Sequence, residues 1–434
     1  MKKAVIILLA ALCAAVLFGR GRGDRSQSET PGAWTSIGPF GGDIVALARN
    51  PKSPAELYAV SQSWPSQVWR STNGGGGWTR QSAVLDRVYD LAADPKTPGK
   101  IYLLGYNTLQ VSTDRGKTFV SFRLPSGFGG TYGRIAVHPS NPKIIIVSGW
   151  FYWDATNYKS VIAVIKTANG GTSWTVQRLT SGSDYGYGRD VAFAKGNPNY
   201  VYLCGDEQKN NTSFPRAFVS KNGGGSWKSV GSPAVFGGDS SSCYALHVDA
   251  RDPKKAWVAH FNGIARTSNA GGSWKAQQTP LISYVTAIAA DASNPKVLYA
   301  GGQMNYVRGA LKSTDGGVTW SLNSKGVYGD SRRILASGPK VYWAGTVGLF
   351  LSKDSGATWN ASHNGIRAAN IDVFAVASSS PNTILVGIYR YTYVRTANGG
   401  ALWTPCGAFY GSEFAGSVAV NPANPNMIYI KPSG

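Results

Sequence analysis

Hydrophobic and polar positions alternate in short runs along this chain, and the runs recur in a fixed order. Residues 88–105, 134–149 and 285–302 each contain an apolar run, an Asp-Pro or Asn-Pro turn, and a second apolar run that ends in a small residue. Short runs rich in β-branched and aromatic residues, bounded by such turns, predict β-strands. The chain is therefore predicted to be all-β from about residue 33 onwards.

A second pattern follows these strand pairs. It reads Ser/Thr-x-Asp/Asn-x-Gly-x-x-Trp/Phe and occurs eight times, at 71–78, 112–119, 167–174, 220–227, 267–274, 313–320, 352–359 and 396–403. Asn-Gly and Asp-Gly favour a tight hairpin because both residues tolerate positive φ. The hydroxyl and the Asp or Asn side chain can bond the backbone of the turn, and the closing ring can be buried between neighbouring sheets.

These motif residues are predicted to be structural. Five of the eight motifs carry Asn in place of Asp. A motif that accepts Asn uses its side chain as a hydrogen-bond acceptor, so it requires neither calcium binding nor carboxylate catalysis. We therefore expect no metal site and no cofactor. The structural residues are Asn73, Trp78, Asp114, Phe119, Asn169, Trp174, Asn222, Trp227, Asn269, Trp274, Asp315, Trp320, Asp354, Trp359, Asn398 and Trp403.

Two strands, a variable loop, a third strand, the motif and a fourth strand together make a four-stranded antiparallel blade. Repetition at intervals of roughly 40 to 55 residues predicts a single β-propeller over residues 33–434. Trp34 opens a stretch like the strand that follows each motif, and residues 416–434 supply two strands that could pair with it. The prediction is eight motif-bearing blades plus a composite closing blade, eight or nine in all, or a fragment of a larger propeller protein.

The repeated motif resembles the Asp-box of sialidases, bacterial xyloglucanase-type glycosidases and the sortilin receptor family. The resemblance covers about residues 33–434 and implies a propeller fold. Two departures weaken any transfer of mechanism. The xyloglucanase-type catalytic Asp follows the second strand of the first blade, where this chain has no acid in residues 57–67. The Phe-Arg-Leu-Pro at 122–125 follows the second box, whereas the similar sialidase motif precedes the first box.

Propeller geometry places the ligand-binding loops on one face. The turn within the first strand pair and the Asp-box hairpin share one end of each blade, and both are nearly constant here. The other loops vary, and variable loops on a rigid scaffold commonly bind ligands. The segment 150–160 is the richest in aromatic residues, which suit a sugar ring, a peptide or a hydrophobic plug. The predicted ligand-binding residues are Trp64, Trp150, Tyr152, Trp153, Tyr158, Tyr306, Tyr389, Arg390 and Tyr391.

Catalytic residues are not identified by the sequence. Glycoside hydrolysis needs two carboxylates roughly 5 to 10 Å apart. The chain has four Glu, and its candidate acids on the variable loops are Asp154, Asp206 and Glu207. If the protein is an enzyme, the resemblance implies a glycoside hydrolase.

The balance of charge favours anionic partners. With 43 Lys and Arg against 22 Asp and Glu, the formal net charge is +21. The basic residues are scattered, and no nucleic-acid-binding motif occurs, so nucleic acid is not expected as a partner. The expected partners are a polysaccharide or an anionic envelope component, or else an acidic protein.

The N-terminal residues 1–25 resemble an export signal. Lys2 and Lys3 precede an apolar stretch, 4–18, that is short for a bilayer span. We therefore predict secretion or export to the periplasm. The segment is either a cleaved signal or an uncleaved anchor, and only an uncleaved anchor would contact a membrane. After this segment, Cys204, Cys243 and Cys406 are expected to be buried thiols, or to include one disulfide.

Two functional hypotheses remain. The first is an exported propeller that binds extracellular polysaccharide through its variable loops, with or without glycoside hydrolase activity. The second is a non-catalytic propeller that binds a protein or acts as an assembly factor, similar to sortilin.

Overall fold

In the computed structural model, the described part of the chain is built almost entirely from β-strands, with one short 3-10 turn at Pro233–Val235. The structure describes residues 41–434 apart from 64, 85, 232, 237, 240, 278, 280–282, 305–306, 328, 363, 365–370, 378–379, 389–391, 401–402, 409–413, 422–423, 425 and 434. The predicted export segment and Trp34 lie outside the described residues.

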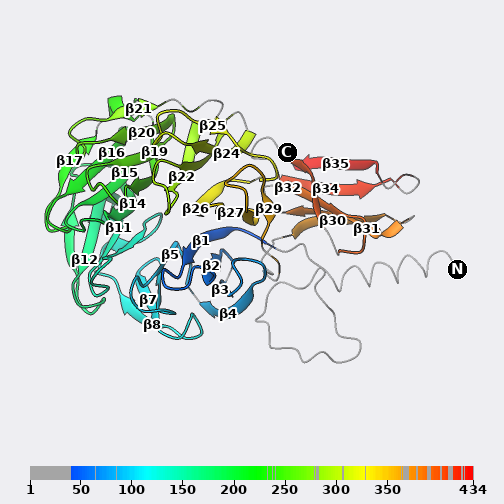
Figure 1. The fold of residues 1–434 in the computed structure, drawn as a ribbon, viewed down its shortest axis with the longest axis horizontal. Helices are drawn as coiled ribbons and strands as arrows, with labels where there is room; N and C mark the ends of the chain where they lie inside the picture. The colour runs from blue at the N-terminus through cyan, green and yellow to red at the C-terminus, as the bar shows by residue number, and fades with distance from the viewer. Residues whose placement is uncertain are drawn as a thin grey trace. The chain divides into compact units, whose positions relative to one another are not determined.

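Seven antiparallel sheets follow one another along the chain, and we call them blades 1 to 7 (Figure 1). The strands of each blade pair in chain order, so hairpins connect neighbours, except that the two-residue strand β9 of blade 3 pairs with β11. Blades 1 to 4 consist of β1–β4 (Ile44–Arg49, Leu57–Ser61, Ser66–Ser71, Thr79–Val84), β5–β8 (Asp90–Ala93, Ile101–Leu104, Thr108–Ser112, Val120–Arg123), β9–β13 (Phe128–Gly129, Ile135–Val137, Ile145–Asp154, Lys159–Thr167, Thr175–Arg178) and β14–β17 (Tyr185–Phe193, Val201–Lys209, Thr212–Ser220, Lys228–Gly231).

Blades 5 to 7 have the same four-stranded order. They consist of β18–β21 (Cys243–Val248, Ala256–His260, Gly263–Thr267, Lys275–Gln277), β22–β25 (Ser283–Ala290, Leu298–Met304, Val307–Ser313, Ser321–Leu322) and β26–β29 (Ser331–Ser337, Lys340–Gly345, Gly348–Ser352, Asn360–Ala361). The prediction of an all-β propeller with four-stranded antiparallel blades is confirmed.

The ring closes between blade 7 and blade 1. The first strands of successive blades contact one another in order, and β1 contacts both β5 and β26. The indole Nε1 of Trp78 donates to the carbonyl of Ser362 at 2.7 Å, and the Ser362 hydroxyl donates to the carbonyl of Gly75. Tyr342 and Leu351 of blade 7 share a buried cluster with Leu57 of blade 1. Seven blades therefore complete the ring.

The expected ring of eight or nine blades was wrong in its number. The eighth Asp-box lies in a further sheet, β30–β33 (Ile371–Ala377, Ser380–Ile388, Thr392–Thr396, Thr404–Ala408). Its first strand packs against the last sheet, β34–β35 (Phe414–Val420, Ile428–Ser433). Because β1 already contacts β26, neither sheet is inserted between blades 7 and 1. The box motif specifies a blade, but contacts between blades decide where a ring closes.

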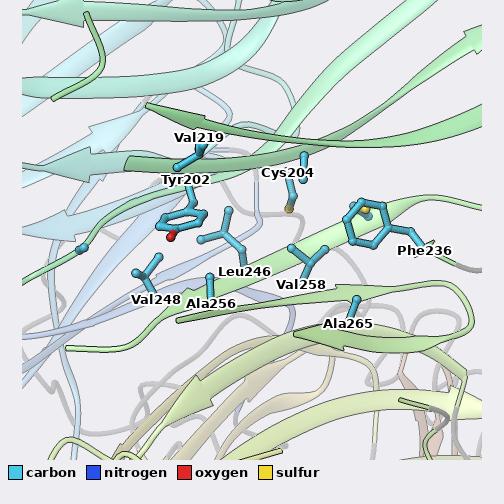
Figure 2. Packing of buried hydrophobic residues seen from close by; sticks show 12 residues of the cluster. Tyr202, Cys204, Val219, Phe236, Leu246, Val248, Ala256, Val258 and Ala265 are labelled. Carbon is cyan, nitrogen blue, oxygen red and sulfur yellow. The ribbon is translucent and has the colours of Figure 1, made fainter. Parts of the chain in front are cut away.

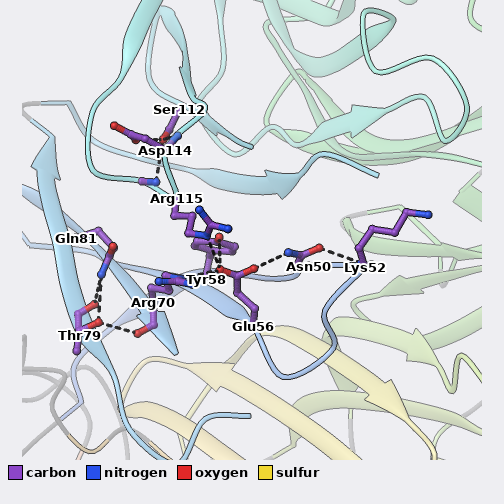
Figure 3. Close-up of polar contacts among 11 residues, drawn as sticks. Asn50, Lys52, Glu56, Tyr58, Arg70, Thr79, Gln81, Ser112, Asp114 and Arg115 are labelled. Carbon is purple, nitrogen blue, oxygen red and sulfur yellow. Dashed lines mark hydrogen bonds and ion pairs between the residues drawn. The ribbon is translucent and has the colours of Figure 1, made fainter. Parts of the chain in front are cut away.

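Each Asp-box is a self-bonded hairpin, as predicted. In the box of blade 2, the Ser112 hydroxyl donates to Asp114 at 2.7 Å and accepts the N–H of Gly116 at 2.8 Å. The box of blade 4 repeats both bonds with Asn222 in place of Asp. Figure 3 shows Ser112 and Asp114 in this arrangement. Asn and Asp thus serve the same accepting role, which explains why the repeats tolerate both.

In the seven blades of the ring, the closing ring of each box packs into the core between adjacent blades. Trp78, Trp320 and Trp359 are buried, and the indole of Trp274 donates to the carbonyl of Val230 in the preceding blade. The remaining box rings pack against core clusters with part of their surface exposed, namely Phe119, Trp174, Trp227 and Trp403. Burial of these large rings links neighbouring sheets that share no strand pairing.

Cys204 and Cys243 lie in the core between blades 4 and 5, with Tyr202 and Phe236 nearby (Figure 2). Both are fully buried free thiols. Burial raises the pKa of each thiol well above its usual value. They therefore pack as small apolar residues. The side chain of Cys406 lies outside the described part.

Candidate ligand-binding site on the loop face

The two ends of the ring differ in what they carry. We call the end formed by the turns between first and second strands, together with the Asp-boxes, the box face. We call the opposite end the loop face. Strands β11, β12, β14, β15 and β16 have 9 or 10 residues each, whereas the corresponding strands of blade 2 have 4 or 5 (Figure 1). Their extra length carries the hairpins of blades 3 and 4 beyond those of blade 2.

An aromatic row lies along one side of the β11–β12 hairpin. The ring centroids of Trp150 and Tyr152 are 4.4 Å apart, and those of Tyr152 and Tyr158 are 6.3 Å apart. Tyr106 of blade 2 extends the row, with its centroid 6.1 Å from that of Trp150. Trp150 is buried, while Tyr106 and Tyr158 are 44% and 67% exposed. A buried indole thus supports exposed phenol rings, and we call these four residues the aromatic row.

Trp153 follows Tyr152 at a register shift in β11, and it contacts the segment that precedes β14. Its indole Nε1 donates to the carbonyl of Ser183 at 2.8 Å, yet 42% of the residue is exposed. The ammonium of Lys159 lies 5.7 Å from its ring centroid and 3.2 Å from the Asp184 carboxylate. Trp153 is therefore held in place and accessible at once.

A second aromatic group surrounds Arg189 on β14. Its guanidinium carbon lies 4.8 Å from the ring centroid of Tyr132 and 5.1 Å from that of Tyr187. Burial acts to lower the pKa of Arg189, but the Asp206 carboxylate more than offsets this and raises it. Tyr132 is 54% exposed. In the sequence, only position points to Tyr187 and Arg189, because both directly precede the buried part of β14, the first strand of blade 4.

The three candidate acids do not form a catalytic pair. Asp154 accepts the backbone N–H groups of Thr156 and Asn157 in its own hairpin, and hydrogen bonds from Asn157 lower the pKa of its carboxyl. Asp206 and Glu207 are adjacent on β15, so their side chains point to opposite faces of the sheet. Asp206 and Glu207 therefore do not face a common space.

Both buried acids also have basic partners. The carboxylate of Asp206 receives two hydrogen bonds from Arg189, at 2.7 and 3.2 Å. Glu207 forms an ion pair with Arg216 and accepts the hydroxyl of Ser183 at 2.8 Å. These contacts link β14 to β15 and β15 to β16. Both acids therefore have a structural role within the sheet of blade 4.

Charged residues on the first strands fill the axis of the ring. Arg333 of blade 7 lies 2.7 Å from Asp90 of blade 2 and 3.9 Å from Asp190 of blade 4. The two acids also accept backbone N–H groups of neighbouring blades, those of Ile135 and Leu246, each at 2.9 Å. Burial raises the pKa of Asp190 although Arg333 opposes it. The groups on the axis are thus engaged in holding blades together.

The remaining predicted ligand-binding residues lie outside the described residues. These are Trp64, Tyr306, Tyr389, Arg390 and Tyr391. In the described part of the chain, no group of three or more His, Cys, Asp or Glu could hold a metal ion. No helix there has the length and hydropathy needed to cross a bilayer.

Comparison with known proteins agrees with this architecture. A family model described as sortilin, neurotensin receptor 3, matches residues 66–175. A xyloglucanase from a Paenibacillus species is 24% identical over 438 residues, which cover 87% of this chain and 41% of the relative. Xyloglucanase Xgh74A of Acetivibrio thermocellus is 23% identical over 371 residues, covering 72% and 42%. The chain therefore spans about two fifths of the length of these relatives.

Solved structures show the same fold at low identity. A GH74 enzyme of Niastella koreensis has a TM-score of 0.58 at 16% identity, covering 91% of this chain and 70% of that one. The GH74 xyloglucanase of Xanthomonas campestris also has a TM-score of 0.58, at 14% identity, covering 90% and 71%. YCF48 from Cyanidioschyzon merolae has a TM-score of 0.51 at 14% identity, covering 72% and 96%. The chain is a sortilin-like and xyloglucanase-like propeller.

Proposed function

We propose that this protein binds extracellular polysaccharide on its loop face, with the aromatic row and Trp153 as the binding platform. The observation that carries the proposal is the exposure of Tyr106, Trp153 and Tyr158 on hairpins held by buried contacts. Flat, rigid aromatic surfaces suit the C–H faces of sugar rings, and their order reduces the entropy lost on binding. The sequence similarity to xyloglucanases supports the same class of ligand.

Binding is proposed ahead of hydrolysis because of the acids. A glycosidase needs one carboxylate that protonates the leaving group and a second that acts as base or nucleophile. Asp206 and Glu207 are nearly buried, and arginines neutralise both. Asp154 is committed to its own turn. If the protein hydrolyses its ligand, the activity belongs to the glycoside hydrolases, and other acids must perform it.

The test is titration calorimetry with soluble xyloglucan and with an uncharged β-glucan. We expect Tyr152→Ala/Tyr158→Ala and Trp153→Ala each to reduce affinity at least about fivefold, since one lost stacking contact corresponds to roughly 1 kcal/mol or more. Tyr429→Ala is the matched control, because Tyr429 is an exposed tyrosine on β35, away from this hairpin in the chain. Its affinity should equal that of the wild type.

Two results would contradict the proposal. Unchanged affinity in both aromatic variants would remove the platform, and no binding of any glycan by the wild type would remove the ligand class. Reducing-sugar release measured with Asp206→Asn and Glu207→Gln separates binding from catalysis. Turnover that these variants abolish, with the fold intact, would overturn the structural role given to the two acids.

A further inference from the structure

The box face carries a repeated basic feature that the proposed function does not use. In six of the seven blades of the ring, the turn between the first and second strands contains a proline followed directly by a lysine. All six lysines are exposed. In the described part of the chain, their ammonium groups form no ion pair. We call them the lysine ring, and they are Lys52, Lys96, Lys143, Lys254, Lys296 and Lys340.

The backbone beneath these side chains is fixed. The N–H of Lys52 donates to Asn50 and that of Lys96 to Asp94, at 3.0 and 2.9 Å. The N–H groups of Lys143, Lys254 and Lys296 are bonded in the same way by the Asx residue two positions earlier. Such Asx turns hold the chain without help from the lysine side chain. The side chains are therefore free to meet a partner.

The Asp-boxes hold the same turns from the other side. The carbonyl of Lys143 accepts the N–H of Gly170, that of Lys254 accepts the N–H of Ala270, and that of Lys296 accepts the N–H of Gly316, at 2.8 to 2.9 Å. In blade 7, Pro339 accepts the N–H of Ser355. Turn and box thus form one rigid unit in each blade. The six lysines are carried at one end of a closed ring.

Several acids at this end are buried, while the box carboxylates Asp114, Asp315 and Asp354 are partly or fully exposed. Glu56 is buried and contacts Asn50, Tyr58 and Arg70 (Figure 3). Asp94 is 1% exposed and accepts the Tyr102 hydroxyl. The box carboxylates are tied to their own turns, as Asp114 is to Thr118. The positive groups therefore extend to solvent while many of the negative groups are held against the backbone.

We propose that the lysine ring docks the box face on the anionic surface of a lipid bilayer. Lysines on both sides of a closed ring can reach a flat partner together, whereas a straight polymer could follow only a few neighbouring blades. Lysine presents a hydrated point charge with no bidentate geometry, which suits a diffuse layer of headgroups more than one specific anion. Basic residues near such a surface each favour binding, and salt weakens the attraction. The loop face then points away from the bilayer.

The test compares vesicles of equal parts phosphatidylglycerol and phosphatidylcholine with vesicles of phosphatidylcholine alone, by co-sedimentation of the full chain. Replacing all six lysines by Gln should reduce partitioning onto anionic vesicles at least about 100-fold at low ionic strength. The six Lys→Arg replacements keep the charge and should keep the binding. Lys209→Gln/Arg123→Gln removes charge from exposed residues outside the lysine ring and should leave it unchanged. All variants share the apolar segment 4–18, so differences between them report the lysines.

Three results would overturn the proposal. Equal binding of the Lys→Gln variant and the wild type would show that the ring is not used. Equal binding to neutral vesicles would show that charge is not used. Binding of soluble polygalacturonate at least as tight as that of anionic vesicles, and dependent on the same lysines, would assign the face to an acidic polymer.

The glycan affinity of the loop face should be unchanged in every lysine variant, so this proposal and the proposed function fail separately. A matched unfolding temperature verifies the fold of each variant, and the triple variant Lys52→Gln/Lys96→Gln/Lys143→Gln should show an intermediate loss.

Discussion

On the box face, every hairpin repeats the same few hydrogen bonds, whereas on the loop face hardly two connections are alike. Each box hydroxyl accepts the N–H four residues later, from Ser71 in blade 1 to Ser352 in blade 7. Towards the loop face, the second strand of blade 3, Ile145–Asp154, has ten residues, whereas the second strand of blade 2, Ile101–Leu104, has four. Stability is thus concentrated in the repeated end and variation in the other, which leaves the loop face free to acquire a ligand.

The sharpest test of this comparison is Trp78→Ala. Trp78 is 6% exposed, and its indole joins blade 1 to blade 7 at the closure of the ring. Loss of the buried ring should lower the free energy of unfolding by about 3–5 kcal/mol, because a cavity and an unpaired carbonyl remain. Chemical denaturation followed by tryptophan fluorescence measures the change. Trp153→Ala on the loop face is the control, and an equal loss there would contradict the division between the faces.

The second prediction concerns the loss of stability at low pH. His260 ends the second strand of blade 5, is 2% exposed, and burial lowers its pKa from 6.5 to about 4. The folded state therefore excludes a proton that the unfolded state binds, so the stabilisation is complete above pH 6.5 and is lost as the pH falls towards 4. Lowering the pH from 7 to 5 should therefore reduce the free energy of unfolding by about 2 kcal/mol through this histidine. Denaturation curves at the two pH values measure the difference.

The control for that prediction is His260→Gln. This variant has no titrating group at the position, so the difference between its stabilities at pH 7 and pH 5 should be smaller than that of the wild type by about the same 2 kcal/mol. An unchanged difference would show that other groups, such as the acids on the axis, govern the response to acid.

The box residues were predictable from the sequence because they act locally. Ser112 and Asp114 complete a turn with partners a few residues away, so spacing alone is sufficient to identify them. Closure of the ring was not predictable in this way. It depends on contacts such as Trp78 with Ser362, separated by 284 residues. The eighth box repeats the local signal outside the ring, and the expected number of blades was too large for that reason.

The loop face shows the same limit. Segment 150–160 was identified by its aromatic content, and Trp150, Tyr152, Trp153 and Tyr158 all lie on the predicted hairpin. Once β15 is known to be a strand, its alternation predicts that Asp206 and Glu207 point to opposite faces of the sheet. The contact of Arg189 with Tyr132 could not be foreseen, since Tyr132 precedes β10 whereas Arg189 lies on β14.

The third prediction tests a single hydrogen bond of the box face. Ser112→Ala removes the acceptor of the buried N–H of Gly116 and the donor to Asp114. An unpaired buried N–H costs about 1–2 kcal/mol of the free energy of unfolding. Thermal and denaturant unfolding would measure it. The control is Ser140→Ala, whose hydroxyl is exposed, and a comparable loss there would show that the box bond has no special weight.

The smallest expected effect belongs to Asn222→Asp. In the Asn box of blade 4, the amide Nδ2 donates to the hydroxyl of Ser226 at 3.0 Å, while Oδ1 accepts the N–H of Ser226. In the Asp box of blade 6, the hydroxyl of Thr319 instead donates to Asp315 at 2.6 Å. The hydroxyl can therefore reverse its role when the amide becomes a carboxylate. The free energy of unfolding at pH 7 should change by less than about 0.5 kcal/mol. Asn222→Leu, which cannot accept, should cost about 1 kcal/mol or more, and equal stabilities of the two variants would show that the box does not depend on an acceptor at this position.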